Sequence, residues 1–177
     1  AQQNKFIVET TPLPLARAFH GTAVLGDFLY VFGGSYLDEQ TDLQEPAAVV
    51  NVAKILPNGS LTKFVQTTWL PNPRHYINNS TIVLNDTVYI LGGSSTIIEG
   101  GIQKTVLWTR PLPNGMLETW RETKPFQETA LECVAAFATP GYLHMAGGLR
   151  EDNTSTNAVW SIRVLPDGSL GQWERAP

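Results

Sequence analysis

The chain has 177 residues, with 12 lysines and arginines against 16 aspartates and glutamates, so its net charge is −4. Hydrophobic residues make up 42% of it and aromatic residues 10%, which excludes a disordered chain and suffices for one domain with a core. An acidic chain without a basic run predicts no nucleic-acid partner, and no apolar stretch approaches the roughly 18 residues of a membrane span. The single cysteine, Cys133, excludes an internal disulfide and a cysteine-based zinc site.

The start of the chain leaves the compartment unassigned. Ala1-Gln2-Gln3 is small and polar, which fits either a mature N-terminus after signal removal or a remnant of cloning. Sequons for N-glycosylation begin at Asn58, Asn78, Asn79, Asn85 and Asn153. Tight turns explain asparagine at two of these places without glycosylation. The localisation is therefore unknown, with a secreted or periplasmic location as the expectation.

The first part of the chain predicts four antiparallel strands. Apolar or alternating segments bounded by glycine, proline and asparagine indicate them. They are expected at residues 19–25, 28–32, 48–56 and 61–66. The first pair is joined by the hairpin turn Gly26-Asp27, and the last pair by the turn Pro57-Asn58-Gly59-Ser60. No segment keeps a 3.6-residue period before glycine or proline interrupts it, so no helix is expected.

Three markers then recur with a period of about 55 residues. A double glycine after an apolar run occurs at Gly33-Gly34, Gly92-Gly93 and Gly147-Gly148. A Leu-Pro-Asn/Asp-Gly turn occurs at residues 56–59, 112–115 and 165–168. An aromatic residue follows each turn, at Phe64, Trp120 and Trp173. Three markers in phase indicate a tandem repeat, and a period near 50 predicts propeller blades.

The apolar run into a double glycine, followed by spaced aromatics, resembles kelch repeats of the bacterial type over residues 5 to 175. The resemblance implies an all-β fold, a β-propeller of three four-stranded antiparallel blades. We expect one repeat domain over residues 1–177, with blades at approximately 15–67, 74–123 and 128–175 and an extra outer strand at 5–9. Departures occur in the third unit, which has His144 where the others have Tyr30 and Tyr89.

Three blades make half of a probable six-bladed ring, because closed propellers have typically four to eight. The expected partner is therefore a second copy of this chain or another propeller segment, which includes a missing part of the same polypeptide. The predicted strand at 5–9 is one outer strand too many for a closed dimer, which favours a piece of a longer propeller. In either case the two end blades of the arc each have an apolar side face against which a neighbouring blade is expected to pack.

The topology of a four-stranded meander brings all the long connections to one end of the ring. We expect the binding site there, because loops on a rigid scaffold carry function. The predicted ligand-binding residues are Arg17, Trp69, Arg74, His75, Tyr76 and Glu128. Arginine offers a bidentate fork to carboxylate or phosphate, and tyrosine or tryptophan a flat surface for a sugar or a peptide side chain. Bracing of the blade junction is the alternative role of Arg17 and Arg74, and the favoured one.

No metal or other cofactor is expected. The acidic stretch Asp38–Asp42 with Glu45 lacks the alternating spacing and the glycine of a standard calcium loop, so it is interpreted as a solvated loop. His144 lies among strand residues and is expected in the core. A copper centre like that of the kelch-type galactose oxidases would require two tyrosines, two histidines and a cysteine together, which the spacing does not predict.

Two classes of function remain open. The favoured one is a binding module without catalytic residues, which recognises a protein or a glycan through the loop end. The other is a sugar-acting enzyme on the same scaffold, similar to the sialic acid mutarotases among kelch-like propellers. Such a site places an acid or base beside arginines, and Arg17, Arg74, Glu128 and Glu132 are its candidates. The fold alone does not distinguish the binding module from the enzyme.

Overall fold

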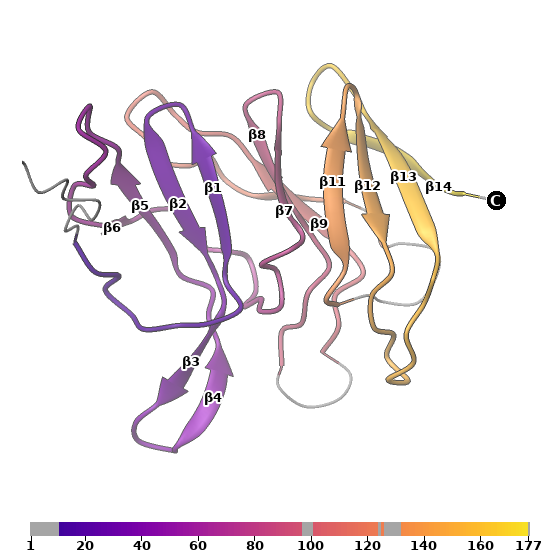
Figure 1. The fold of residues 1–177 in the computed structure, drawn as a ribbon, viewed down its shortest axis with the longest axis horizontal. Coiled ribbons are helices and arrows are strands. Elements are labelled where there is room, and N and C mark those ends of the chain that lie inside the picture. The colour runs from indigo at the N-terminus through magenta and orange to yellow at the C-terminus, as the bar shows by residue number, and fades with distance from the viewer. Residues whose placement is uncertain (1–10, 97–100, 124, 126–131, 177) are drawn as a thin grey trace, which may run out of the picture.

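The computed structural model describes residues 11–96, 101–123, 125 and 132–176, and its regular structure there is entirely β (Figure 1). Three antiparallel sheets of four strands follow one another along the chain. The first contains β1 (Gly21–Leu25), β2 (Phe28–Phe32), β5 (Val50–Lys54) and β6 (Val65–Gln66). The second contains β7 (Thr81–Leu84), β8 (Thr87–Leu91), β9 (Val106–Thr109) and β10 (Arg121–Glu122). The third contains β11 (Ala135–Thr139), β12 (Tyr142–Ala146), β13 (Val159–Val164) and β14 (Leu170–Arg175).

The sequence prediction of repeated four-stranded meanders is confirmed, since the strands of each sheet are ordered as in the chain. The third strand of the first unit is shorter than expected, at 50–54 rather than 48–56. The connection after β2 was not predicted to contain strands, yet β3 (Ser35–Asp38) and β4 (Leu43–Pro46) pair as a hairpin of their own. The extra strand predicted at 5–9 lies outside the described residues, and the exact blade bounds stay a prediction.

Tight turns set the register of the inner hairpins. The turn between β1 and β2 opposes Leu25 to Phe28, and Gly26 within it has a φ of 54°. In the second sheet Asn85 and Asp86 have φ values of 50° and 55°, which is the positive-φ pair that a two-residue primed turn requires. Both turns therefore place the apolar side chains of neighbouring strands on the same face of the sheet.

The sheets pack face to face, and the core lies between them. Their first strands β1, β7 and β11 are neighbours, so these form the inner side of the arc. One buried cluster joins Ala23, Tyr30 and Val52 of the first sheet to side chains of the second sheet, including Ile90 and Trp120. A second cluster joins the second sheet to the third through side chains such as Tyr89, Trp108 and Met145. Burial on both faces explains the nearly continuous apolar composition of β8, all five residues of which are buried.

Each of the two sheet interfaces contains the same hydrogen bond. The Tyr30 hydroxyl donates to the carbonyl oxygen of Gly115 at 2.8 Å, and the Tyr89 hydroxyl donates to that of Gly168, also at 2.8 Å. Both acceptors lie in the Leu-Pro-Asn/Asp-Gly turn of the next sheet. Burial raises the pKa of Tyr30 to about 12, so the hydroxyl keeps its proton and stays a donor. The repeated turn motif therefore receives the tyrosine of the preceding sheet.

His144 does not lie in the core as the sequence predicted. It occupies the tyrosine position in the third sheet, but its ring is only half-buried. Its two ring nitrogens lie 2.7 Å from the hydroxyl oxygens of Thr139 and Ser161, and the Phe137 ring stacks on it at 4.8 Å. The reason is that no described sheet follows the third one, so the face on which buried tyrosines lie in the first two sheets is open here.

Candidate functional site

The long connections gather at one end of the arc, as the meander topology predicted. Figure 1 shows the β3–β4 hairpin and the connections that follow β8 and β12 at the lower end of the molecule. The links that enter the first strand of each sheet reach the same end. We call this the loop end. In each link a bridge ties the chain to the residue after the double glycine: Ala18 to Ser35, His75 to Ser94 and Glu132 to Leu149.

One residue in each link adopts a left-handed backbone conformation directly after its bridge. Phe19, Tyr76 and Cys133 have φ values of 55°, 57° and 54°. Such a conformation costs a non-glycine residue on the order of 1 kcal/mol or more, and it persists only where the surrounding structure imposes it. Its recurrence at the same place in three links shows that the repeat itself imposes it.

Aromatic side chains cluster at this position. The rings of Phe19 and Tyr76 lie 4.9 Å apart between centroids, and the ring of His75 lies 4.2 Å from that of Tyr76. Phe19 is 44% exposed, although it is a large apolar side chain. The pair spans two neighbouring links, because the backbone N–H of Ile77 donates to the carbonyl oxygen of Phe19 at 3.3 Å. The cluster therefore presents aromatic surface beside the inner strands β1 and β7.

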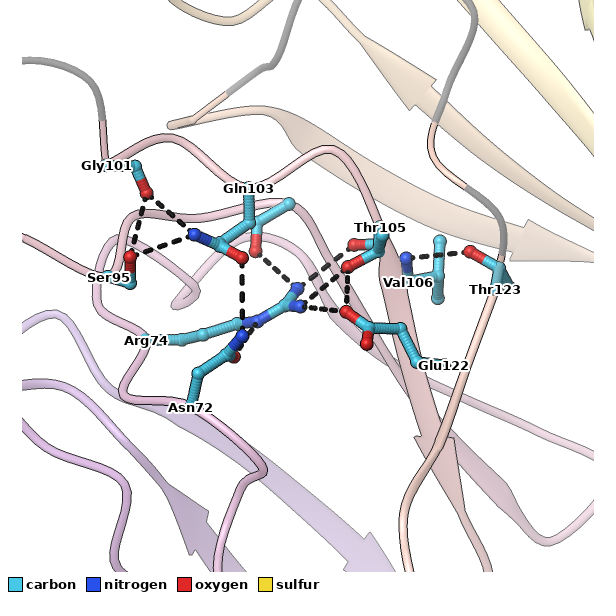
Figure 2. A network of polar contacts seen from close by, with 10 residues as sticks. Asn72, Arg74, Ser95, Gly101, Gln103, Thr105, Val106, Glu122 and Thr123 are labelled. Atoms are coloured by element: carbon cyan, nitrogen blue, oxygen red, sulfur yellow. Dashed lines mark hydrogen bonds and ion pairs between the residues drawn. The ribbon is translucent and has the colours of Figure 1, made fainter.

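Arg74, two residues before Tyr76, is a fully buried brace (Figure 2). Its guanidinium donates to the carbonyl oxygens of Gly92 and Thr105, each at 3.0 Å, and to the Thr105 hydroxyl at 2.8 Å. It also forms an ion pair with Glu122 of β10 at 3.3 Å. Burial lowers its pKa to about 10, against the opposite effect of Glu122, so it stays charged at neutral pH. Arg74 thus ties together the ends of β8, β9 and β10.

Figure 2 also shows how the network continues through the connection after β8. Asn72 accepts a hydrogen bond from the Arg74 Nε at 3.2 Å and lies 3.4 Å from the side-chain amide oxygen of Gln103. The Gln103 amide in turn donates to the Ser95 hydroxyl and to the Gly101 carbonyl oxygen, both at 2.9 Å. The brace therefore also fixes both ends of a loop-end connection.

Arg17 repeats the brace in the first sheet. It donates to the carbonyl oxygens of Gly33 and Val49 at 3.2 and 2.9 Å, which are the counterparts of the two carbonyls bound by Arg74. It also donates to the side chain of Asn51. Burial lowers the pKa of Arg17 to about 10. These contacts fit the bracing alternative, although the Arg17 Nε is buried without a hydrogen-bond partner. Ligand contact by either arginine stays a prediction.

The remaining predicted site residues differ in how exposed they are to solvent. Trp69 is 56% exposed on the link between the first two sheets, and the neighbouring Thr68 is tied to the second sheet by the Trp120 indole N–H at 3.1 Å. His75 is buried and its Nε2 lies 2.9 Å from the carbonyl oxygen of Thr96. Glu128 lies outside the described residues. The structure therefore has Trp69 exposed, Tyr76 half-buried and His75 buried, and ligand contact by these residues stays a prediction.

Sequence reasoning missed Phe19, although a signal for it exists. Arg17-Ala18-Phe19 and Arg74-His75-Tyr76 share an arginine and an aromatic residue with the same spacing, and Phe19 was interpreted only as the start of a strand. The third link carries Glu132 at the position of His75. Glu132 is half-buried, and burial raises the pKa of its carboxyl above the ordinary value. Burial and the adjacent Glu132 charge likewise raise the pKa of Cys133.

Within the described residues there is no cluster of three or more histidine, cysteine, aspartate or glutamate side chains able to hold a metal ion. The acidic stretch predicted as a solvated loop forms the tip of the β3–β4 hairpin, where the Asp38 carboxylate accepts the backbone N–H of Gln40 at 2.8 Å. The described residues also contain no helix long and apolar enough to cross a membrane.

Comparison with solved structures decides the fold. The structure of YjhT superposes with a TM-score of 0.71 and 16% sequence identity, over 91% of this chain and 52% of that one. The chain has a β-propeller fold. The spermatocyte protein spe-26 of Caenorhabditis elegans is 25% identical over 160 residues, which cover 85% of this chain and 24% of that protein. No family model matches the chain. The propeller segment thus spans about half the length of YjhT and about a quarter of that of spe-26, and its three sheets are blades.

Proposed function

We propose that the loop end of this propeller binds a sugar and catalyses interconversion of its anomers, as a mutarotase-like isomerase. The observation that carries the proposal is the aromatic pair of Phe19, which is 44% exposed, and Tyr76, which is half-buried. In the next link the carboxyl of Glu132 lies at the position of His75, directly before the residue equivalent to Tyr76. Flat aromatic surface stacks on the apolar face of a sugar ring, while a carboxyl with a raised pKa is suited to proton transfer near neutral pH.

The reaction needs only proton transfers. The anomeric hydroxyl loses its proton while the ring oxygen gains one, and the bond between the anomeric carbon and the ring oxygen breaks to give the open-chain carbonyl. Closure on the opposite face reverses these steps, so no oxidant or cofactor is consumed. Glu132 acts as the acid–base group, with water as the second proton carrier. The arginines hold the links in place, because their nitrogens are engaged by backbone carbonyls.

The test measures binding and turnover on the same protein. D-glucose and N-acetylneuraminic acid serve as probes, with saturation-transfer NMR for binding and two-dimensional exchange NMR for the anomerisation rate. We expect Tyr76→Ala to abolish the saturation-transfer signal and Glu132→Gln to keep it while lowering the catalysed rate by about 10²-fold or more. Absence of both binding and rate acceleration for both sugars with the wild-type chain would contradict the proposal.

A binding module for a protein or glycan is the second candidate. Trp69 on the link between the first two blades and Leu37 and Leu43 of the β3–β4 hairpin are exposed apolar side chains. A module of this kind would show saturation transfer without rate acceleration if its ligand is a glycan. A protein ligand would give neither signal and would depend on Trp69 instead.

A further inference from the structure

Both internal interfaces of the segment are built from one pair of surfaces. A blade presents its tyrosine, and the following blade presents a turn whose glycine carbonyl accepts the hydroxyl. The two turns have the same geometry: Gly115 and Gly168 have φ values of 82° and 88°, and each N–H donates to the carbonyl oxygen of the leucine three residues before it. The Phe28 ring packs directly against Gly115, so a side chain there would clash with it.

The first blade carries a third copy of this turn without a described neighbour. Gly59 has a φ of 82°, and its N–H donates to Leu56 at 2.8 Å, as in the two docked turns. The Asn58 side chain accepts the N–H of Ser60 at 3.1 Å, as Asn114 and Asp167 do for their own turns. A Cβ at Gly59 would meet nothing within 4 Å. The turn is thus preformed in the docking geometry, and the space around it is open.

The third blade carries the complementary face. His144 pairs with Phe137 as Tyr30 pairs with Ala23, so the imidazole stands at the register position of the tyrosine hydroxyl donor. Two residues before it, Tyr142 stands at the position of Phe28. The sequence therefore retains an imidazole at the tyrosine position and the aromatic ring of Tyr142 for a turn that no part of the described chain supplies to it.

Exposure shows that parts of both surfaces are open. On the first blade Leu13 of the same chain packs against Val31, Ala53 and Phe64, and Val24 and the turn 57–60 lie outside this contact. Phe137 is 48% exposed, whereas Ala23 and Ile82 at the same position of the other blades are buried at 8%. On the opposite side of the arc, Val24 is 54% exposed, while its counterparts Val83 and Ala138 pack against the preceding blade. We call these surfaces the blade-3 face (Phe137, Tyr142, His144) and the blade-1 face (Val24 and the turn 57–60).

We propose that the blade-3 face binds the blade-1 face of a second copy of this chain, head to tail, so that two copies close a ring. His144 lies at the tyrosine position of this interface, and its ring nitrogens keep their contacts with Thr139 and Ser161. The two-fold axis creates this interface twice, which leaves neither face open. This chain covers 52% of the YjhT chain, so a ring of that size requires about as much chain again.

The first measurement is sedimentation equilibrium of the wild-type chain from about 1 to about 100 µM, a range that covers ordinary dimer affinities. We expect a species of twice the monomer mass of 19.4 kDa. Phe137→Asp and Val24→Asp each place a carboxylate in both interfaces, so each is expected to weaken association by about tenfold or more. Both side chains are already exposed, so the folded monomer tolerates the change. Leu43→Asp on the β3–β4 hairpin, 60% exposed, is the matched control and is expected to dimerise like the wild type.

A mixture of the two variants identifies the head-to-tail geometry. Phe137→Asp retains an intact blade-1 face and Val24→Asp an intact blade-3 face, so the mixture regains one unaltered interface and associates more tightly than either variant alone. Three results would overturn the proposal. The first is a wild-type chain that stays monomeric throughout the concentration range, as expected if a further segment of a longer polypeptide occupies the faces. The second is equal dimerisation of the wild type and all variants. The third is a mixture that associates no more tightly than either variant alone.

Discussion

Arg74 shows how one side chain can fix the end of a blade. Its buried guanidinium satisfies two carbonyl oxygens, a hydroxyl and a carboxylate at the ends of three strands. A planar fork with five N–H donors suits this arrangement, whereas an ammonium group cannot reach all partners at once. The positive charge is therefore kept in the core by directed hydrogen bonds rather than by the ion pair alone, since Glu122 is 44% exposed.

We expect Arg74→Lys to lower the free energy of unfolding by about 3 kcal/mol, because it leaves buried carbonyl oxygens without a donor. Urea denaturation followed by tryptophan fluorescence measures this. Sugar binding by the folded variant should be retained, as Arg74 has no exposed surface. Loss of binding with unchanged stability would instead assign Arg74 to ligand contact. Arg121→Lys, an exposed arginine in the same blade, serves as the matched control.

His75 makes stability depend on pH. Its Nε2 donates to the Thr96 carbonyl oxygen, so the proton lies on Nε2, and Nδ1 is buried with no hydrogen-bond partner in the structure. Burial lowers the pKa of His75 below its ordinary value of 6.5, although the hydrogen bond to Thr96 acts in the opposite direction. The unfolded chain therefore binds a proton at a higher pH than the folded chain does.

Stability should consequently fall as the pH drops below about 6.5 and continue to fall until the folded imidazole also protonates. Burial lowers the pKa of His20 as well, so His75 accounts for part of this slope. The urea midpoint measured between pH 7.5 and pH 5 should decline less in His75→Gln than in the wild type. Parallel curves for the two proteins would contradict the assignment.

At the scale of the element, the double glycine is required for the close approach of a link to the blade. Gly93 has a φ of 89°, and a Cβ there would lie 2.5 Å from Ile77 Cγ2 and 2.8 Å from the His75 carbonyl oxygen. The adjacent Gly92 also has a positive φ, of 63°. The motif thus combines a backbone conformation that favours glycine with a lack of space for any side chain.

We expect Gly93→Ala to destabilise the protein by about 3 kcal/mol, since it adds a steric clash to the cost of the backbone conformation. Gly26→Ala is the control, because Gly26 also has a positive φ but nothing within 4 Å of an added Cβ, and it should cost about 1 kcal/mol. Thermal unfolding by circular dichroism compares the two variants. Equal losses would show that the conformation alone, and not the contact with the link, explains the motif.

Elements with a periodic signal could be predicted from the sequence, and elements that depend on tertiary contact could not. The hairpin of Gly21–Leu25 with Phe28–Phe32 was predicted because its alternation and Gly26-Asp27 turn are local. The β3–β4 hairpin was missed because Leu43–Pro46 is charged and ends in proline. The left-handed backbone of Phe19 and Tyr76 leaves no local mark, since the bridges to Ser35 and Ser94 impose it. The aromatic pair of the candidate site, Phe19 and Tyr76, was therefore only partly predictable from the sequence.

At the scale of the whole molecule, the segment behaves as a row of blades coupled through neighbouring interfaces. Tyr30 and Tyr89 each donate one hydrogen bond across an interface, and both hydroxyls are buried. The two interfaces share the second blade but have no tyrosine contact in common. Nearest-neighbour coupling of this kind makes stability close to a sum of blade and interface contributions.

We therefore expect Tyr30→Phe and Tyr89→Phe to lower the free energy of unfolding by about 1 kcal/mol each, and the double variant by about 2 kcal/mol. The phenyl ring keeps its packing, so the loss measures the hydrogen bond together with the unsatisfied carbonyl of Gly115 or Gly168. Tyr36→Phe, on the β3–β4 hairpin outside both interfaces, should have no measurable effect. Urea denaturation of the four proteins provides the comparison. A double variant that loses much more than the sum would show that the two interfaces cooperate, and that the segment unfolds as one unit rather than as a row of coupled blades.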